Sequence, residues 1–244
     1  MSQTEEKVLN LHGKRVVVLG GTSGIGFAIA QLACTQQATV VVGSRSEDKV
    51  ATALERLSRA TGQTVDLRDE SSLSQFFESV GAFDHLAITA GDWDTPLFGS
   101  LLNLDFSQAQ ALMEVRFWGV LQAVKYASKI IAQDGSITLT GGLLAQRPRK
   151  GTVMATTLAG AVASLTTALA MDLAPIRVNA VAPGIILTEA TNQRPEATLQ
   201  ALVAHQPLPR VGTPFDAAQA YLYLMNNSYV TGQVLPLDGG SLLV

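Results

Sequence analysis

The glycine-rich turn GGTSGIG constrains the fold of this chain more than any other stretch. The apolar run RVVVLG (15–20) ends at glycine, and the helix-like stretch GIGFAIAQLACTQQ (24–37) follows it. Gly20 permits a tight turn, Gly24 lets the backbone approach a pyrophosphate, and Gly26 lets the helix pack close to the strand. A strand, such a turn and a helix in this order predict the start of a dinucleotide-binding fold.

Six further apolar runs follow, with helical patterns between them. They are continuous in Val, Ile and Leu, which is typical of parallel strands buried on both faces. We therefore predict an α/β fold, a Rossmann-type doubly wound, seven-stranded parallel sheet flanked by helices on both faces. A glycine-rich turn alone is weak evidence for a cofactor, and its place before six more strands strengthens it. The runs are 38–45, 62–67, 83–91, 135–142, 176–184 and 232–240, and the predicted helices include 46–58, 70–80, 106–133, 152–173 and 214–225.

No linker, internal repeat or low-complexity segment divides the chain. A single dinucleotide-binding domain over residues 1–244 is therefore the economical organisation. The stretch after Gly184 is long and contains several prolines. Such a segment is typical of a substrate lid, which we place at about residues 185–213.

Composition and charge exclude several classes of protein. The net charge is −3 and no strongly basic region exists, so nucleic acid is not an expected partner. One cysteine, Cys34, rules out an internal disulfide framework and suits a reducing compartment. The N-terminus is acidic and polar without an apolar signal core, and Thr, Gly and Ser interrupt the apolar stretch 151–171. We interpret that stretch as a buried helix rather than a membrane span, and expect a soluble, cytoplasmic protein.

The residues at the end of the predicted second strand indicate whether the cofactor is NAD or NADP. An acidic residue there would bind the ribose 2′-OH of NAD and repel a 2′-phosphate. This chain instead has Arg45, with hydroxyl donors at Ser44 and Ser46. Charge-assisted hydrogen bonds from an arginine to phosphate favour NADP(H). The alternative is a solvated Arg45 that pairs with a neighbouring acid such as Glu47.

Several motifs in the right order make the chain resemble the short-chain dehydrogenase/reductase family over nearly its whole length. GGTSGIG resembles that family's cofactor loop, and TAG matches the end of its NNAG motif. RVNAVAPG resembles its sixth strand with the PG turn beside the nicotinamide, and VTGQVLPLDGG its C-terminal strand. The resemblance implies a homotetramer or homodimer built on the long helices. It also implies these cofactor contacts: Gly20, Thr22, Ser23, Gly24, Ile25 and Gly26 at the phosphates, Asp66 and Leu67 at the adenine, and Ala90, Gly91, Pro183, Gly184 and Thr188 towards the nicotinamide.

The family's catalytic Asn, Ser, Tyr and Lys must be carried over one by one, and none of them matches. Arg116 stands at the Asn position and Gly142 at the Ser position. Without gaps, Ala155 stands at the Tyr and Ala159 at the Lys. Residues 151–171 contain no Tyr and no Lys, so a shift of register restores neither. The resemblance assigns proton donation to the Tyr, so this chain is a divergent member that would take its proton from water or a non-standard residue.

Other side chains are candidates to compensate. Arg116 is the best, since its guanidinium can replace the lost ammonium, although it does not deprotonate; the alternative is pairing with a buried acid. Thr140 carries a hydroxyl near the vacated site, or serves only the structure. The predicted substrate contacts are Trp93, Phe98, Leu143 and His205, and the two aromatics favour an aromatic substrate, a packed lid being the alternative. No metal-ligand spacing is present in the sequence.

Three functions follow from these residues. The first is an NADPH-dependent oxidoreductase that reduces a ketone or other small-molecule carbonyl by hydride transfer. The second is a catalytically inactive NADP(H)-binding sensor or assembly protein, suggested by the loss of all four catalytic residues. The third is a different reaction on the same scaffold, such as elimination or isomerisation, which a fold alone does not exclude.

Overall fold

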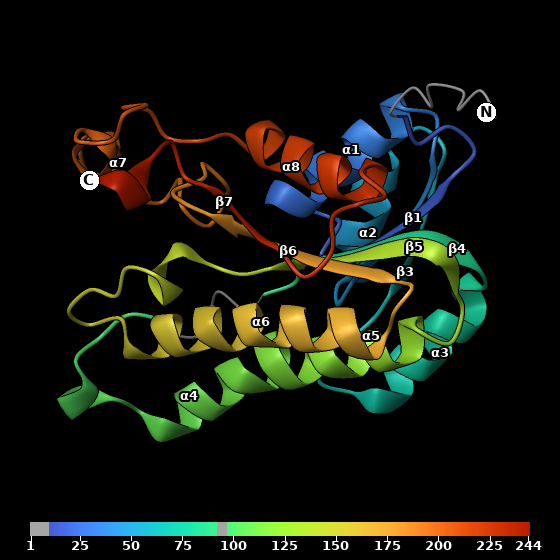
Figure 1. The fold of residues 1–244 in the computed structure, drawn as a ribbon, viewed down its shortest axis with the longest axis horizontal. Helices are drawn as coiled ribbons and strands as arrows, with labels where there is room; N and C mark the ends of the chain where they lie inside the picture. The colour runs from blue at the N-terminus through green and yellow to red at the C-terminus, as the bar shows by residue number, and fades with distance from the viewer. Residues whose placement is uncertain (1–9, 92–96) are drawn as a thin grey trace, which may run out of the picture.

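A seven-stranded, all-parallel sheet forms the centre of the molecule in a computed structural model (Figure 1). The structure describes residues 10–91 and 97–244. The strand order is β3-β2-β1-β4-β5-β6-β7, so the chain reverses direction across the sheet between β1 and β4. The predicted fold is therefore confirmed, with the ligand-binding edge expected at the carboxyl ends of the strands. The strands are β1 (Arg15–Leu19), β2 (Thr39–Ser44), β3 (Ala60–Thr64), β4 (Phe83–Ile88), β5 (Ile131–Thr140), β6 (Arg177–Pro183) and β7 (Val234–Leu237).

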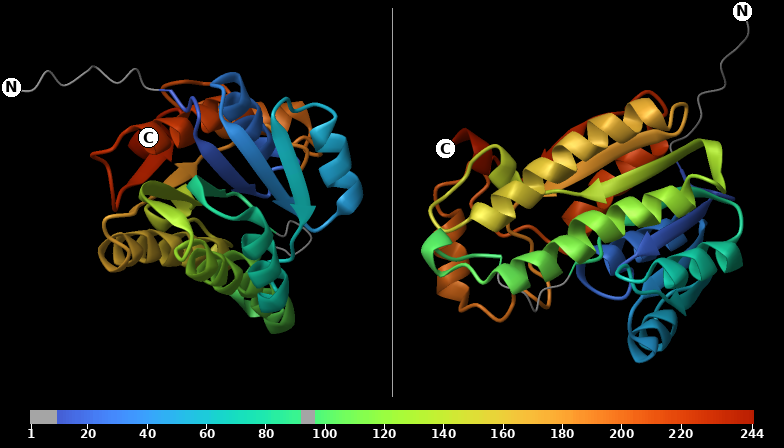
Figure 2. Two further views of the ribbon diagram at one scale, coloured as in Figure 1. Left: turned by 90° about the vertical axis from the view of Figure 1, so that its right-hand side faces the viewer. Right: turned by 90° about the horizontal axis from the view of Figure 1, so that it is seen from below.

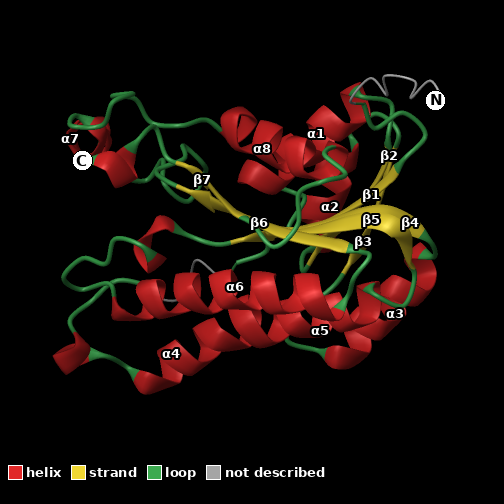
Figure 3. Cartoon of the chain, viewed as in Figure 1, coloured by secondary structure: helices red, strands yellow, loops and turns green. Residues whose placement is uncertain are grey.

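Helices cover both faces of the sheet (Figure 3). One layer contains α1, α2 and α8, and the other contains α3, α4, α5 and α6. The helix α7 lies apart from both layers, in the lid near the C-terminus. The helices are α1 (Gly24–Thr35), α2 (Glu47–Leu54), α3 (Glu70–Val80), α4 (Phe106–Met113), α5 (Val120–Ala127), α6 (Val153–Asp172), α7 (Glu196–Val203) and α8 (Pro214–Asn226).

Strand alternation divides the core between the two layers. In β1, Val17 and Leu19 belong to the cluster that packs against α3, α5 and α6. Val16 and Val18 belong to the cluster with α1, α2 and α8. Because successive side chains of a strand point to opposite faces, the positions of β1 from Val16 to Leu19 are each buried on one side or the other. This double burial explains the unbroken valine run.

The predicted helix over 106–133 is wrong as a single element. A π-helical segment, η2 (Glu114–Gly119), separates α4 from α5, and α5 ends at Ala127. Ile131 already belongs to β5, since it pairs with Phe83 of β4. The third strand also lies at residues 60–64 rather than 62–67. The π-helical segment divides the predicted helix and strand pairing sets the start of β5, and sequence periodicity reports neither.

The helix α6 is only partly covered by the rest of the chain. It packs on β5 and β6, it is long and apolar enough to cross a membrane by length and composition alone, and most of it is not buried. Such a helix is weak evidence for a membrane, because a core helix of a soluble protein passes the same test. Figure 2 shows α6 beside α4 and α5, so these helices form one broad surface.

Candidate active site

The turn between β1 and α1 has the shape that a phosphate-binding loop needs. A Cβ on Gly26 would collide with the Gly20 carbonyl oxygen, and one on Gly20 would lie 2.6 Å from the Ala90 nitrogen. Gly20 and Gly24 have positive φ angles of 87° and 50°, which side chains disfavour. Ser23 caps α1 with extended backbone, and its hydroxyl makes no cap hydrogen bond. The first N–H groups of α1 therefore have no side-chain cap from Ser23, and such groups at a helix N-terminus suit a pyrophosphate.

The predicted 2′-phosphate contacts lie together beyond the end of β2. The Thr22 hydroxyl donates to the Ser44 hydroxyl oxygen at 3.2 Å, which brings the first turn next to β2. Arg45 is exposed, and its charge acts on Asp66. The Ser46 hydroxyl accepts from the Lys49 nitrogen as the cap of α2, so this hydroxyl already has a structural task.

Asp66 makes an ion pair that the sequence did not indicate. Arg68 donates to both carboxylate oxygens of Asp66, at 3.1 Å from Nε and 2.7 Å from Nη2. The hydrogen bond from Arg68 holds the pKa of the Asp66 carboxyl below its ordinary value. Leu67 beside it is buried. The predicted adenine end of the site thus carries one fixed carboxylate between the cations Arg68 and Arg45.

Arg116 reaches the carboxyl end of β4. A Cβ on Gly91 would lie 2.5 Å from Arg116 Nη2 and 2.8 Å from Cζ, so a larger residue at this position would displace the guanidinium. The Nε and Nη2 atoms are buried. Arg116 lies in the π-helical segment η2, and π-helical turns occur frequently at functional sites. The structure therefore places a cation at the position that the sequence proposed.

The positions that the resemblance assigns to the catalytic Ser and Lys face each other. A Cβ on Gly142 would lie 3.5 Å from the Ala159 Cβ, and Ala159 is buried. Ala155 lies one turn earlier on α6 and is half-buried. Thr152 and Thr156 share a hydrogen bond of 3.0 Å at the start of the same helix. Small side chains thus line this part of α6.

Thr140 points away from this side of the sheet. Its hydroxyl donates to the Ile88 carbonyl oxygen at 2.6 Å and lies 2.6 Å from the Tyr221 hydroxyl on α8. Tyr221 is fully buried, and burial raises the pKa of its hydroxyl. The expected role of Thr140 near the vacated Ser position is corrected here: its neighbour Leu139 faces α6, and Thr140 crosslinks the sheet to the opposite helical layer.

Of the four predicted substrate contacts, Leu143 lies beside the PG turn and the exposed Phe98 lies next to a backbone contact with the start of α6; their contact with substrate stays a prediction. Leu143 Cδ1 would lie 3.5 Å from a Cβ on Gly184, in the PG turn. Phe98 precedes Gly99, whose N–H donates to the Gly151 carbonyl oxygen at 2.8 Å, just before α6. His205 is an exposed residue in the turn after α7. Trp93 lies outside the described residues.

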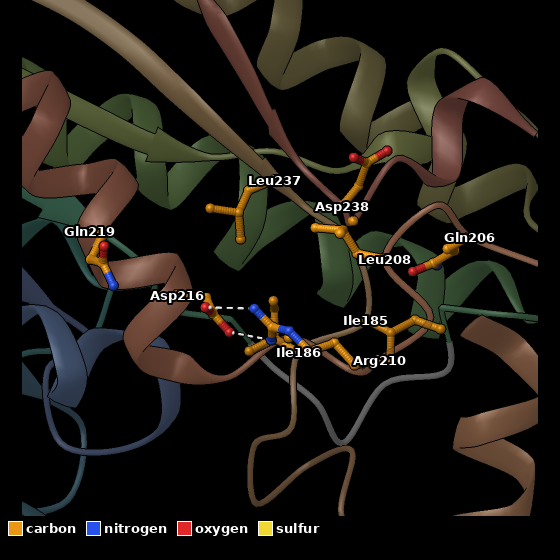
Figure 4. A pocket seen from close by; sticks show the side chains of 11 residues that line it. Ile185, Ile186, Gln206, Leu208, Arg210, Asp216, Gln219, Leu237 and Asp238 are labelled. Atoms are coloured by element: carbon orange, nitrogen blue, oxygen red, sulfur yellow. Dashed lines mark hydrogen bonds and ion pairs between the residues drawn. The ribbon is translucent and has the colours of Figure 1, made fainter. Parts of the chain in front are cut away.

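A small cavity lies behind the lid (Figure 4). Its volume is about 230 Å³, and Ile185, Leu208 and Leu237 contribute apolar walls. Arg210 and Asp216 form a two-point ion pair at its edge, with bonds of 2.8 and 3.0 Å. This pair ties the end of the lid to the start of α8. Among the described residues, no cluster of three His, Cys, Asp or Glu side chains suits a metal ion.

The sheet order and the glycine-lined turn after its first strand define a Rossmann-type dinucleotide-binding protein. A family model described as enoyl-(acyl carrier protein) reductase matches residues 20–241. The short-chain dehydrogenase/reductase ATR9 of Stachybotrys chlorohalonatus is 35% identical, over 96% of this chain and 98% of that protein. This chain belongs to the short-chain dehydrogenase/reductase family.

Two solved structures are similar over nearly the whole chain. One is a small-chain dehydrogenase in complex with NADPH, with 35% identity and a TM-score of 0.82 over 95% of this chain and 99% of that chain. The other is the MalC Reductase/Diels-Alderase of Malbranchea aurantiaca, with 32% identity and a TM-score of 0.88 over 96% of this chain and 98% of that chain.

Proposed function

We propose that this protein is an NADP(H)-dependent oxidoreductase that reduces the carbonyl group of a small molecule without the family's usual Tyr and Lys. The observation that carries the proposal is the glycine-lined loop at the N-terminus of α1, with Thr22, Ser44 and Arg45 beside it. A relative of known structure binds NADPH, and the matching family model describes a reductase.

The residues of this chain would share the work as follows. The first N–H groups of α1 bind the pyrophosphate, and Arg45 pairs with the 2′-phosphate. The reduced nicotinamide supplies hydride when bound. Arg116 donates hydrogen bonds to the substrate oxygen and stabilises its negative charge. Because a guanidinium stays protonated, the proton itself comes from water. Orientation then provides most of the acceleration, for which about 7–11 kcal/mol is available in well-aligned reactions.

Cofactor titrations followed by turnover assays test this proposal. We expect NADPH to bind more tightly than NADH. Arg45→Ala should weaken the binding of NADPH by about 1.5–3 kcal/mol, which is the contribution of a charged hydrogen bond. Slow, stereoselective NADPH oxidation is expected with activated aryl ketones. Equal Kd values for the two cofactors would contradict the cofactor assignment. Confirmed NADPH binding with no turnover over the panel would contradict the reductase assignment.

A second candidate is a reaction without hydride transfer in the same pocket. The sequence of α6 contains neither Tyr nor Lys, and a relative of similar structure is named as both a reductase and a Diels-Alderase. Conversion of a substrate by the protein without change in NADPH absorbance would favour this candidate. NADPH binding with no conversion, together with a stable partner, would favour the alternative of an inactive sensor or assembly protein.

The remaining proposals concern the protein's surroundings. We propose a homo-oligomer, a dimer or tetramer, because much of the apolar helix α6 is uncovered in one chain. The net charge of −3 gives no reason to expect nucleic acid as a partner. A cytoplasmic location without membrane association stays a prediction, which the single cysteine supports.

A further inference from the structure

The first turn of the lid touches the phosphate loop. A Cβ on Gly24 would lie 3.2 Å from the Thr188 Cγ2 atom and 3.6 Å from the Glu189 Oε2 atom. Gly24 is the first residue of α1, and it is the glycine at which the backbone is open to a pyrophosphate. A carboxylate oxygen from the lid therefore lies within a few ångströms of the place that the cofactor's phosphates require.

The position of Glu189 is fixed by a compact turn. The Thr188 N–H donates to the Thr191 hydroxyl oxygen at 2.7 Å, and that hydroxyl donates to the Ile186 carbonyl oxygen at 2.6 Å. The Asn192 N–H donates to the Thr188 carbonyl oxygen at 2.8 Å. At the base of the lid, Ile186 also pairs with Gly212. Hydrogen bonds within the turn and the pairing with Gly212 thus hold its backbone, and Glu189 lies near its start.

The charge of this side chain suits the end of α1. The N-terminus of a helix carries about half a positive charge and favours a nearby anion by about 0.3–1 kcal/mol. The first turn of α1 has no acidic residue of its own, and Ser23 leaves the N-terminus without a side-chain cap. Glu189 is the anion that the described structure supplies there. Glu189 is exposed and lies near these N–H groups, and a pyrophosphate bound to them would repel its carboxylate.

We propose that Glu189 is an anionic latch, which holds the lid against the phosphate loop before the cofactor binds and must withdraw when the pyrophosphate enters. The latch lowers the affinity for the cofactor and speeds its release. The inference rests on the proposed binding of NADP(H) at this loop. It assigns the lid a role in cofactor exchange in addition to covering the substrate.

Paired lid variants test the latch through binding rather than turnover. Glu189→Gln removes the charge and keeps the shape, and Glu189→Ala removes both. Glu196→Gln on α7 removes an equal charge from another exposed lid position and is the matched control. Fluorescence titration should give a Kd for NADPH about 2- to 10-fold lower in both Glu189 variants, in line with loss of a helix-terminus interaction plus repulsion. The Kd of Glu196→Gln should equal that of the wild type.

A ligand without a pyrophosphate distinguishes the effect of the latch from a general effect of the lost negative charge on anion binding. Adenosine 2′-monophosphate should bind the wild type and Glu189→Gln equally, and the gain for NADPH should shrink at high salt because exposed charges are screened. Hydrogen exchange should be faster in residues 185–192 of cofactor-free Glu189→Gln than in the wild type. Unchanged NADPH affinity and unchanged exchange would overturn the latch. Failure of the wild type to bind NADPH would instead overturn the proposed function.

Discussion

Substitutions of Arg116 can separate a role in binding the substrate oxygen from a role in binding the cofactor. The guanidinium of Arg116 lies beside Gly91, shortly after β4, and the resemblance to the family places it where other members have an uncharged amide. If it binds the substrate oxygen, Arg116→Gln should lower kcat/KM for carbonyl reduction by about 10- to 100-fold, the value of one charged hydrogen bond. The Kd of NADPH should change little, and Arg116→Lys should retain part of the activity.

Arg194→Gln, an exposed lid variant, is the control for lost charge. A purely structural Arg116 would be recognised by a lower melting temperature with an unchanged kcat/KM for the folded fraction. A change confined to the Kd of NADPH would place the guanidinium at the nicotinamide ribose rather than at the substrate.

His85 should make stability depend on pH. It is buried between strands, with Nδ1 2.9 Å from the Ser136 hydroxyl oxygen, and burial lowers its pKa to about 4. The unfolded chain binds this proton near pH 6.5 and the folded chain only near pH 4, so stability is full above 6.5 and falls as the pH drops through this window. The loss should approach about 2–3 kcal/mol at pH 4. Urea unfolding from pH 7.5 to 4.5 measures it, and His85→Gln should flatten the profile.

At the scale of elements, the ion pair between Arg210 and Asp216 anchors the lid. Asp216 also accepts from the Thr213 N–H at 2.8 Å in the capping box of α8. Asp216→Ala removes the cap and the ion pair and should cost about 1–2 kcal/mol of stability. Arg210→Ala removes only an exposed pair and should cost less than about 1 kcal/mol. Thermal unfolding compares them. Equal losses in the two variants would mean that the cap contributes nothing beyond the pair.

The elements also show what the sequence could predict. The strands and the β1–α1 turn were predictable because glycine spacing and continuous valines have direct steric causes. The face of the sheet on which Thr140 lies was also predictable, because neighbouring side chains on a strand point to opposite faces and Leu139 faces α6. The π-helical turn at Arg116 was not predictable, because the shift to hydrogen bonds between residues five apart leaves no signal in the amino-acid composition. The helix α7 and the contact of Glu189 with Gly24 depend on the path of the lid, which proline-containing segments leave open.

At the scale of the molecule, the covered and uncovered faces of α6 argue for self-association. Met171 on α6 is 83% exposed, and Trp118 on the neighbouring η2 is 49% exposed. Exposed apolar side chains gathered on adjacent helices usually mark an interface. A second copy is the partner we expect, because two identical surfaces around a twofold axis can cover each other. The surface lies opposite the layer of α1 and α8, so it leaves the cofactor loop accessible (Figure 2).

Light scattering during gel filtration tests this surface. The wild-type mass should be a multiple of the 25.7 kDa chain, and Trp118→Glu or Met171→Glu should shift it towards one chain, since a charge buried without a partner is costly. Tyr223→Glu introduces the same charge at an exposed aromatic on α8, in the opposite layer, and should keep at least a dimer. A wild type that elutes as a single chain would refute the interface. Unchanged assembly in both α6-side variants would move the interface to another face of the molecule.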